Sequence, residues 1–254
     1  MTEWSWATDD FAALWYDDAR DRFPSPLRYT SRFRLRDEFA AHRSAVFARY
    51  GAEERDEIDA ALGTLADAVI RIEILGGSSR HRRSTGADDV RQYRIIGART
   101  AFRSVVAVQY GTDSEHGPIR LRMSRAEDLP ARLAAAIPGC PAGGEGPETF
   151  HPDDLRQTRN SYLEDNGRNT PRDRYRRLVG RPADGGGSAV LLVGPLNRLD
   201  PPLAALQWHD ITGDGRYTER RGAHVSVRPT TTADLIAGFT AWIDRAGQRL
   251  REEH

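Results

Sequence analysis

The spacing of hydrophobic residues changes from a helical period to an alternating one within the first half of the chain. Residues 4–68 predict a short strand and three amphipathic helices, which begin near Thr8, Arg36 and Glu53. From Val69 onward the apolar positions alternate, which predicts four strands. These strands are Val69–Leu75, Val90–Arg99, Phe102–Gly111 and Pro118–Met123. A helix follows, with Ser124 and Glu127 as its predicted capping box.

The second half of the chain repeats this order of elements. Two segments with helical patterns, 151–165 and 171–180, come before four alternating segments that predict strands. These strands are 187–194, 203–211, 215–221 and 223–229. The last predicted helix covers 230–250, with Thr231 and Asp234 as its capping pair.

The two halves also resemble each other in sequence where each one ends. The pairs of identical residues at an offset of 106 include Arg122 with Arg228, Asp128 with Asp234, Leu129 with Leu235, and Ile137 with Ile243. We therefore predict an α+β fold with a central, mostly antiparallel β-sheet and helices at its face or ends. We expect a single domain of two pseudo-symmetric halves, about 1–137 and 150–254. The Pro/Gly-rich segment 138–149 is interpreted as the linker between them.

The composition is that of a globular protein and excludes several kinds of chemistry. No apolar run approaches the roughly 20 residues of a transmembrane helix, and the first residues lack the pattern of a signal peptide. We therefore expect a cytoplasmic protein without membrane insertion. All 37 basic residues are arginine, which excludes lysine-dependent phosphate binding and Schiff-base chemistry. A single cysteine, Cys140, excludes an intrachain disulfide and a cysteine-based zinc cluster.

The stretch WHDITGDGRY (Trp208–Tyr217) has the oxygen-bearing side chains of a calcium loop at alternating positions. A loop that begins at Asp210 needs a glutamate at its twelfth position, but that position is Arg221, whose charge repels a cation. The flanking segments are predicted strands, whereas helices flank a calcium loop of this type. The stretch is therefore interpreted as a hairpin turn, and we predict neither a metal nor a cofactor.

The neighbouring His209 and Asp210 suggest a catalytic pair. Adjacent residues of a strand point to opposite faces of a sheet, so the two side chains do not easily share one site. We predict a protein that is not an enzyme and has no catalytic residues. The alternative hypothesis is a small-molecule-binding or hydrolytic α+β domain that uses His209 and Asp210.

A polar segment, Gly76–Asp89, separates two of the predicted strands and contains a basic run. The run is Arg80, His81, Arg82 and Arg83. One interpretation is a solvated hairpin loop, and the other is a partner-binding loop whose arginines form bidentate bonds with carboxylates. A second arginine cluster, Arg168–Arg181, has helical spacing and is typical of a solvated helix face. A nucleic-acid-binding protein that uses both clusters is a less favoured hypothesis, because 37 acidic residues balance the 37 arginines.

Nearly the whole chain resembles the EspG family, the cytosolic chaperones of type VII (ESX) secretion in actinobacteria. Three quoted stretches carry the resemblance: DDFAALWYDDARDRFPSPLRY, IDAALGTLADAVIRIEI and HDITGDGRYTERRGAHVSVRPTTTADLIAGF. They are similar to the family's first helix with its Pro-x-Pro-Leu segment, its helix that leads into the sheet, and its late strand pair with the final helix. The order of two α+β halves is similar as well.

The resemblance implies a non-enzymatic protein that binds the hydrophobic helical tip of a PE/PPE-like heterodimer and keeps it soluble until secretion. An exposed apolar tip favours aggregation, and a chaperone that buries it removes this hazard. The resemblance also implies that the loop after the second sheet strand, Gly76–Asp89, contacts the substrate, which assigns Arg80, His81, Arg82 and Arg83 to partner binding. A monomer or weak homo-oligomer is expected.

Overall fold

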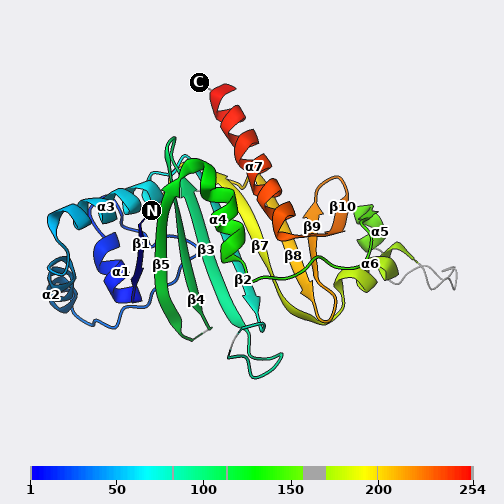
Figure 1. Ribbon diagram of the computed structural model, residues 1–254, viewed down its shortest axis with the longest axis horizontal. Coiled ribbons are helices and arrows are strands. Elements are labelled where there is room, and N and C mark those ends of the chain that lie inside the picture. The colour runs from blue at the N-terminus through cyan, green and yellow to red at the C-terminus, as the bar shows by residue number, and fades with distance from the viewer. Residues whose placement is uncertain (1, 82, 113, 157–169, 199, 253–254) are drawn as a thin grey trace.

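A ten-stranded antiparallel sheet forms the centre of the protein (Figure 1). The computed structural model describes residues 2–81, 83–112, 114–156, 170–198 and 200–252. The strands are β1 (Glu3–Trp6), β2 (Ile70–Ser78), β3 (Arg91–Arg99), β4 (Arg103–Gly111), β5 (His116–Arg125), β6 (Glu148–Phe150), β7 (Ala183–Val193), β8 (Ala204–Ile211), β9 (Arg216–Arg221) and β10 (Val225–Pro229). Their order across the sheet is β1-β5-β4-β3-β2-β7-β8-β9-β10-β6.

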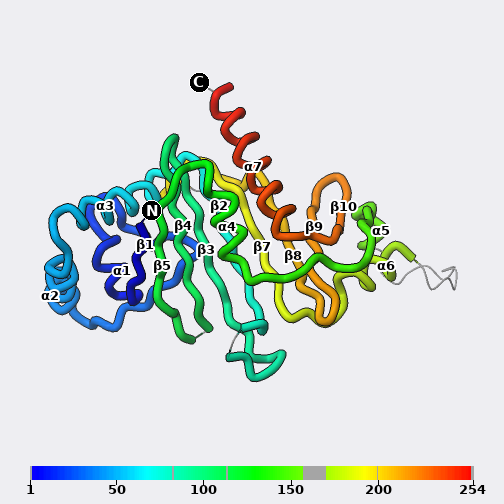
Figure 2. Tube along the Cα trace, in the orientation of Figure 1, coloured from blue at the N-terminus to red at the C-terminus, as the bar shows by residue number. Residues whose placement is uncertain are grey.

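This strand order is symmetric about the central pair of β2 and β7. Strands β2 to β5 form one meander and β7 to β10 form another, and Figure 2 shows them extending from the centre in opposite directions. Strand β1 pairs with β5 at one edge, and β6 pairs with β10 at the other. The structure therefore confirms the predicted α+β class with an antiparallel sheet and two pseudo-symmetric halves.

Helices cover both faces of the sheet. They are α1 (Thr8–Trp15), α2 (Arg36–Phe47), α3 (Ala52–Ala66), α4 (Leu129–Ala136), α5 (Pro152–Arg156), α6 (Pro171–Val179) and α7 (Thr232–Glu252). We call the face that carries α4 and α7 the front face, because these helices lie in front of the sheet in Figure 1. On the opposite back face, α1 to α3 pack on the first half and α5 and α6 on the second.

The alternation of side chains along the strands divides the hydrophobic core between these faces. In β3, Ile95 packs on the front face in a cluster that contains Leu129 of α4 and Phe239 of α7. The next residue, Ile96, packs on the back face with side chains of α1 and α3. The front cluster therefore joins the two halves, whereas each half has its own cluster on the back face.

Only one of the two predicted capping pairs forms. Thr231 and Asp234 bond reciprocally at the start of α7, with Asp234 N donating to Thr231 Oγ1 over 3.1 Å. Ser124 instead remains in β5, where its Oγ lies 3.1 Å from Ser104 Oγ. A short 3₁₀ turn over Ala126–Asp128 then leads into α4. The predicted capping box at Ser124 and Glu127 is therefore wrong, because the strand continues to Arg125, two residues beyond its predicted end.

The segment 138–149 packs against β9 and contains the start of a strand. Arg216 N donates to Pro141 O over 2.7 Å, and Gly143 N donates to Arg216 O over 3.1 Å. Its last residues enter β6, which the sequence pattern did not reveal. Helix α5 covers Pro152–Arg156 of the predicted helix 151–165, and the residues from 157 to 165 lie outside the described residues.

Glycines in β7 allow aromatic side chains to pack directly on the sheet. A Cβ atom at Gly187 would lie 2.5 Å from Trp208 Cζ2 and 2.8 Å from the Tyr93 hydroxyl. We expect Gly187→Ala to lower the free energy of unfolding by about 1–3 kcal/mol, because the added methyl group overpacks this core. Gly63→Ala is the control: Gly63 lies within α3, and its Cβ would meet nothing within 4 Å. It should raise stability by roughly 0.5–1 kcal/mol, and urea denaturation measures both changes.

Candidate protein-binding surface

A strip of the back face lies open between the two groups of helices. It consists of nine positions on β2, β7 and β8 that the strand register places in three rows of three. The rows are Glu73, Val190 and Ala205; Leu75, Ser188 and Gln207; and Gly77, Gly186 and His209. We call these nine residues the central strip.

The middle row of the central strip carries an exposed apolar side chain, Leu75. Leu75 is 49% exposed although β2 is a central strand of the sheet. Beside it, Gln207 and Ala205 are also exposed, Gly186 has no side chain, and the side chain of Val90 packs against Gly77. A surface of this kind permits close approach of another polypeptide, because small residues leave its floor flat. Besides the carboxylate of Glu73, its polar groups are the amide of Gln207, the hydroxyl of Ser188 and the imidazole of His209, which supply hydrogen-bond donors and acceptors.

One wall of the strip is a polar cluster around the buried carboxylate of Glu219, whose side chain is 1% exposed. Tyr175 of α6 donates its hydroxyl to Glu219 Oε2 over 2.9 Å, and Arg221 Nε lies 2.6 Å from Oε1. His209 Nε2 lies 3.4 Å from Oε2. Burial raises the pKa of Glu219, but the bonds from His209 and Tyr175 and the charge of Arg221 outweigh it, so the pKa is lowered. The cluster fixes His209 at the border of the strip.

A second wall forms at the end of the strip next to Glu73, around the buried side chain of Arg71, which is 3% exposed. Its guanidinium donates to the carbonyl oxygens of Pro195 and Arg198, which orders the turn between β7 and β8. Its Nε also donates to Glu73 Oε1 over 3.2 Å, and Ser25 Oγ donates to the other oxygen of Glu73. Two strands and the segment before α2 are thereby joined at this border.

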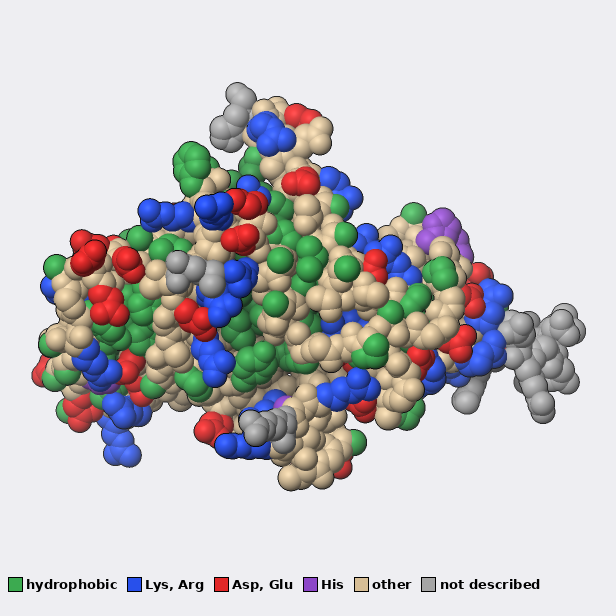
Figure 3. All heavy atoms as spheres, in the orientation of Figure 1, with side chains coloured by type: hydrophobic (Ala, Val, Ile, Leu, Met, Phe, Trp, Pro, Cys, Tyr) green, Lys and Arg blue, Asp and Glu red, His purple; other side chains and the backbone are tan. Residues whose placement is uncertain are grey.

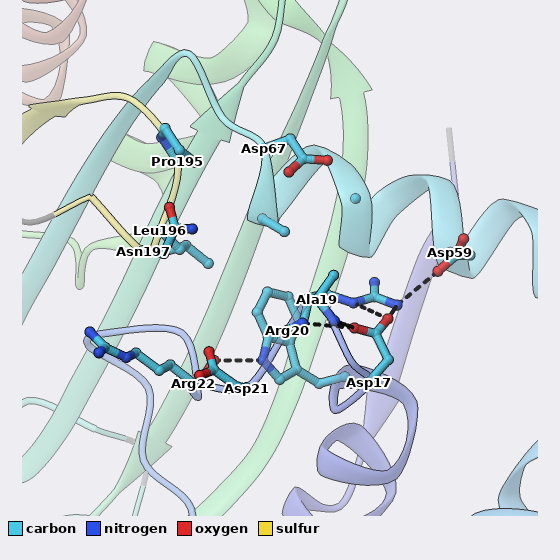
Figure 4. A pocket seen from close by; sticks show the side chains of 13 residues that line it. Asp17, Ala19, Arg20, Asp21, Arg22, Asp59, Asp67, Pro195, Leu196 and Asn197 are labelled. Carbon is cyan, nitrogen blue, oxygen red and sulfur yellow. Dashed lines mark hydrogen bonds and ion pairs between the residues drawn. The ribbon is translucent and has the colours of Figure 1, made fainter.

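A pocket of about 230 Å³ lies beyond this wall, between α3, the segment after α1 and the turn before β8. Figure 4 shows that the carboxylates of Asp17 and Asp59 are both directed at Arg20. Trp15 Nε1 donates to the backbone carbonyl of Arg22 over 2.7 Å in the same pocket. These interactions attach the segment after α1 to α3, so we assign the pocket a structural role.

The loop predicted to bind a partner begins after Ser78, at one end of the central strip. Arg80 Nε donates to Asp184 Oδ2 over 2.6 Å, so its guanidinium is held by the neighbouring strand β7. His81 Nε2 lies 2.9 Å from the carbonyl oxygen of Asp89. Arg83 is exposed, and Arg82 lies outside the described residues. The loop is thus attached to the sheet through Arg80, whereas Arg83 faces solvent.

The attachment of this loop should depend on pH. Hydrogen bonds from Thr212 and then Arg80 lower the pKa of Asp184. A lowered pKa stabilises the folded state above the ordinary value near 3.9, and this contribution is lost as the pH falls below that value. We expect Asp184→Asn to be less stable than the native chain at pH 6, with a difference that shrinks below about pH 4.

Urea denaturation across this pH range measures the difference between Asp184→Asn and the native chain. The exposed Asp56→Asn serves as the control and should show no such convergence. An unchanged difference down to about pH 2.5 would mean that Asp184 does not hold the loop by its charge.

The two residues of the predicted catalytic pair lie on opposite faces of the sheet. His209 contacts Glu219 on the back face, whereas Asp210 is buried on the front face against Arg216, with Nε–Oδ1 and Nη2–Oδ2 distances of 2.7 and 2.8 Å. The structure therefore contradicts the alternative in which His209 and Asp210 share one hydrolytic site. The turn between β8 and β9 is confirmed, with Gly213 at φ +73°.

Three observations concern the hypotheses of nucleic-acid binding, metal binding and membrane insertion. Arg174 of the second arginine cluster lies 3.4 Å from Glu148, and part of that cluster falls outside the described residues. The described residues contain no group of three or more His, Cys, Asp or Glu side chains arranged to hold a metal ion. Among the described helices, none is long and apolar enough to span a bilayer.

The sequence of β2 contains a signal for the central strip. Ile70, Ile72 and Ile74 alternate along β2 and are buried on the front face. Leu75 follows directly and is out of phase with them, so it points to the back face beside Arg71 and Glu73. An apolar residue out of phase in a central strand therefore indicates a second contact surface.

The sequence profile of the EspG family matches residues 7–238. Among curated proteins, none matches the chain. One solved structure with a similar fold is that of the Mycobacterium tuberculosis type VII secretion system chaperone EspG5 in complex with the PE25–PPE41 dimer. The match has a TM-score of 0.60, covers 96% of each chain and has 16% sequence identity. At 16% sequence identity, this similarity shows the fold alone.

Proposed function

The chain belongs to the EspG family, and we propose that it is a non-enzymatic type VII secretion chaperone that binds the hydrophobic helical tip of a PE/PPE-like heterodimer in the cytoplasm. The observation that carries the proposal is the exposed Leu75 on the open central strip. The similar fold of EspG5, solved in complex with the PE25–PPE41 dimer, supports the choice of partner.

The chemistry of the central strip suits the tip of a helical pair. Such a tip presents apolar side chains together with backbone groups that have no partner within the helix. Leu75 and Ala205 supply apolar surface, while Gln207, Ser188 and His209 supply donors and acceptors beside it. Burying the apolar side chains of the tip against this surface removes them from water and prevents their aggregation.

The loop that follows β2 forms the second part of the proposed surface. Arg80 fixes the loop to β7 through Asp184, and we assign Arg80, His81, Arg82 and Arg83 to the border that contacts the partner. The exposed Arg83 is suited to a carboxylate next to the apolar tip. In this arrangement Leu75 provides most of the affinity, and the loop adds orientation and specificity.

Co-expression of the chain with a PE/PPE-like pair tests the function. The expected result is a soluble ternary complex that co-purifies, together with a larger soluble fraction of the pair than in cells without the chain. Absence of both effects, with the chain and the pair each well expressed, would overturn the proposal. A pair whose tip residues are replaced by serine is the matched control, and it should remain unbound.

A further inference from the structure

Three arginines meet on the front face between α7 and the β9–β10 hairpin. Arg220 lies on β9, Arg228 on β10 and Arg245 on α7. Arg220 pairs with Ser226 across the hairpin, so Arg228 is its diagonal neighbour on the same face. Figure 3 shows basic side chains gathered between α7 and this hairpin. We call Arg220, Arg228 and Arg245 the front-face arginine cluster.

Helix α7 has a glycine, Gly238, at the point where the side chain of Arg220 packs against it. A Cβ atom at Gly238 would come within 3.4 Å of Arg220 Nη2. Arg245 follows Gly238 by seven residues and therefore occupies the same side of the helix two turns later. The guanidinium of Arg220 is consequently half-buried between the strand and the helix, close to a second guanidinium.

Within the described chain, no carboxylate forms an ion pair with Arg220, Arg228 or Arg245. Asp234 interacts electrostatically with Arg228, but its carboxylate accepts hydrogen bonds from Thr231 at the helix start. Burial, and then the charges of Arg228 and Arg245, lower the pKa of Arg220. The half-buried Arg220 therefore lies in the field of two further positive charges.

The corresponding place in the first half is neutralised. Arg122, which aligns with Arg228, pairs with Glu3 of the edge strand β1. In the second half, the edge strand β6 places Glu148 opposite Val227, so the position opposite Arg228 falls on Pro147. The second half thus lacks the carboxylate that its symmetry mate has, and it carries additional arginines on the same face.

We propose that Arg220, Arg228 and Arg245 form a binding site for an oxyanion, a phosphate or a carboxylate, on the front face. Guanidinium groups bind such anions with two parallel hydrogen bonds, and in the proposed site they come from β9, β10 and α7. The site lies on the face opposite the central strip, so the anion and the secretion substrate occupy different surfaces.

Calorimetric titration of the full chain with inorganic phosphate, at constant ionic strength set with chloride, tests the site. We expect saturable binding by the native chain. Arg220→Gln should weaken it at least about tenfold, because a charge-assisted hydrogen bond is lost. Arg245→Gln, a change on the helix surface, should have the same effect and remains informative if Arg220→Gln does not fold. Arg122→Gln is the matched control and should leave phosphate binding unchanged.

A second arm uses an oligoglutamate peptide as the probe. Binding of phosphate alone supports the site with a free phosphate as ligand, whereas binding of the peptide, lost in Arg220→Gln, supports it with carboxylates of a protein as ligand. The proposal is overturned if neither probe binds the native chain. It is equally overturned if Arg122→Gln weakens binding as much as Arg220→Gln does.

Discussion

Replacing Asp210 with alanine is expected to lower the free energy of unfolding by about 3–5 kcal/mol, since it leaves a buried arginine without its counterion. The side chain of Arg216 is 1% exposed, and both of its bonds to the Asp210 carboxylate are shorter than 3 Å. Its Nη2 also donates to the carbonyl oxygen of Pro138, and its backbone bonds to Pro141 and Gly143. Removing the Asp210 carboxylate should therefore also detach the segment 138–149 from β9.

Thermal and urea denaturation measure this effect. The midpoint temperature should fall by roughly 6–20 °C for a chain of this length. The double change of Asp210→Leu with Arg216→Leu is the informative control, because it removes both charges and should destabilise less than Asp210→Ala alone. A loss below about 1 kcal/mol in Asp210→Ala would show that this pair does not hold the second half together.

Replacing Leu75 with aspartate is expected to weaken binding of a PE/PPE-like heterodimer at least about a hundredfold, because it places an unpaired charge in the centre of the proposed interface. The isolated chain should fold normally, since Leu75 is 49% exposed and a substitution at such a position disturbs little packing. Titration calorimetry of the purified chain with the heterodimer measures the affinity, and circular dichroism confirms the fold.

Phe102→Asp provides the matched control for this experiment. Phe102 is 86% exposed at the hairpin between β3 and β4, away from the central strip. Exposed apolar residues are common on protein surfaces, so exposure alone does not mark an interface. Equal losses of affinity in Leu75→Asp and Phe102→Asp would contradict the assignment of the strip, whereas a loss in Leu75→Asp alone agrees with it.

The order of elements could be predicted from sequence because each one follows a local pattern. The strand alternation in both meanders and the helical spacing in α3 and α7 are visible in windows of about ten residues. The hairpin turn at Gly213 and the separation of His209 from Asp210 also follow from local geometry. These features need no knowledge of how distant segments meet.

The surface between the elements could not be predicted in this way. The central strip exists only because β7 pairs with β2, whose residues lie more than a hundred positions earlier in the sequence. This pairing places Ser188 and Gln207 beside Leu75. Short β6 was missed for a related reason, since its three residues are held by pairing with β10 and not by their own pattern. The attachment of Arg80 to Asp184 likewise depends on the β2–β7 pairing.

Photo-crosslinking from position 75 tests the central claim most directly. A photoreactive phenylalanine analogue at Leu75, in the chain co-purified with a PE/PPE-like heterodimer, should crosslink to residues at the tip of the partner's helices. The same group at Phe102 should give no crosslink to the partner. Crosslinks from position 102 with none from position 75 would contradict the proposal that the central strip binds the secretion substrate.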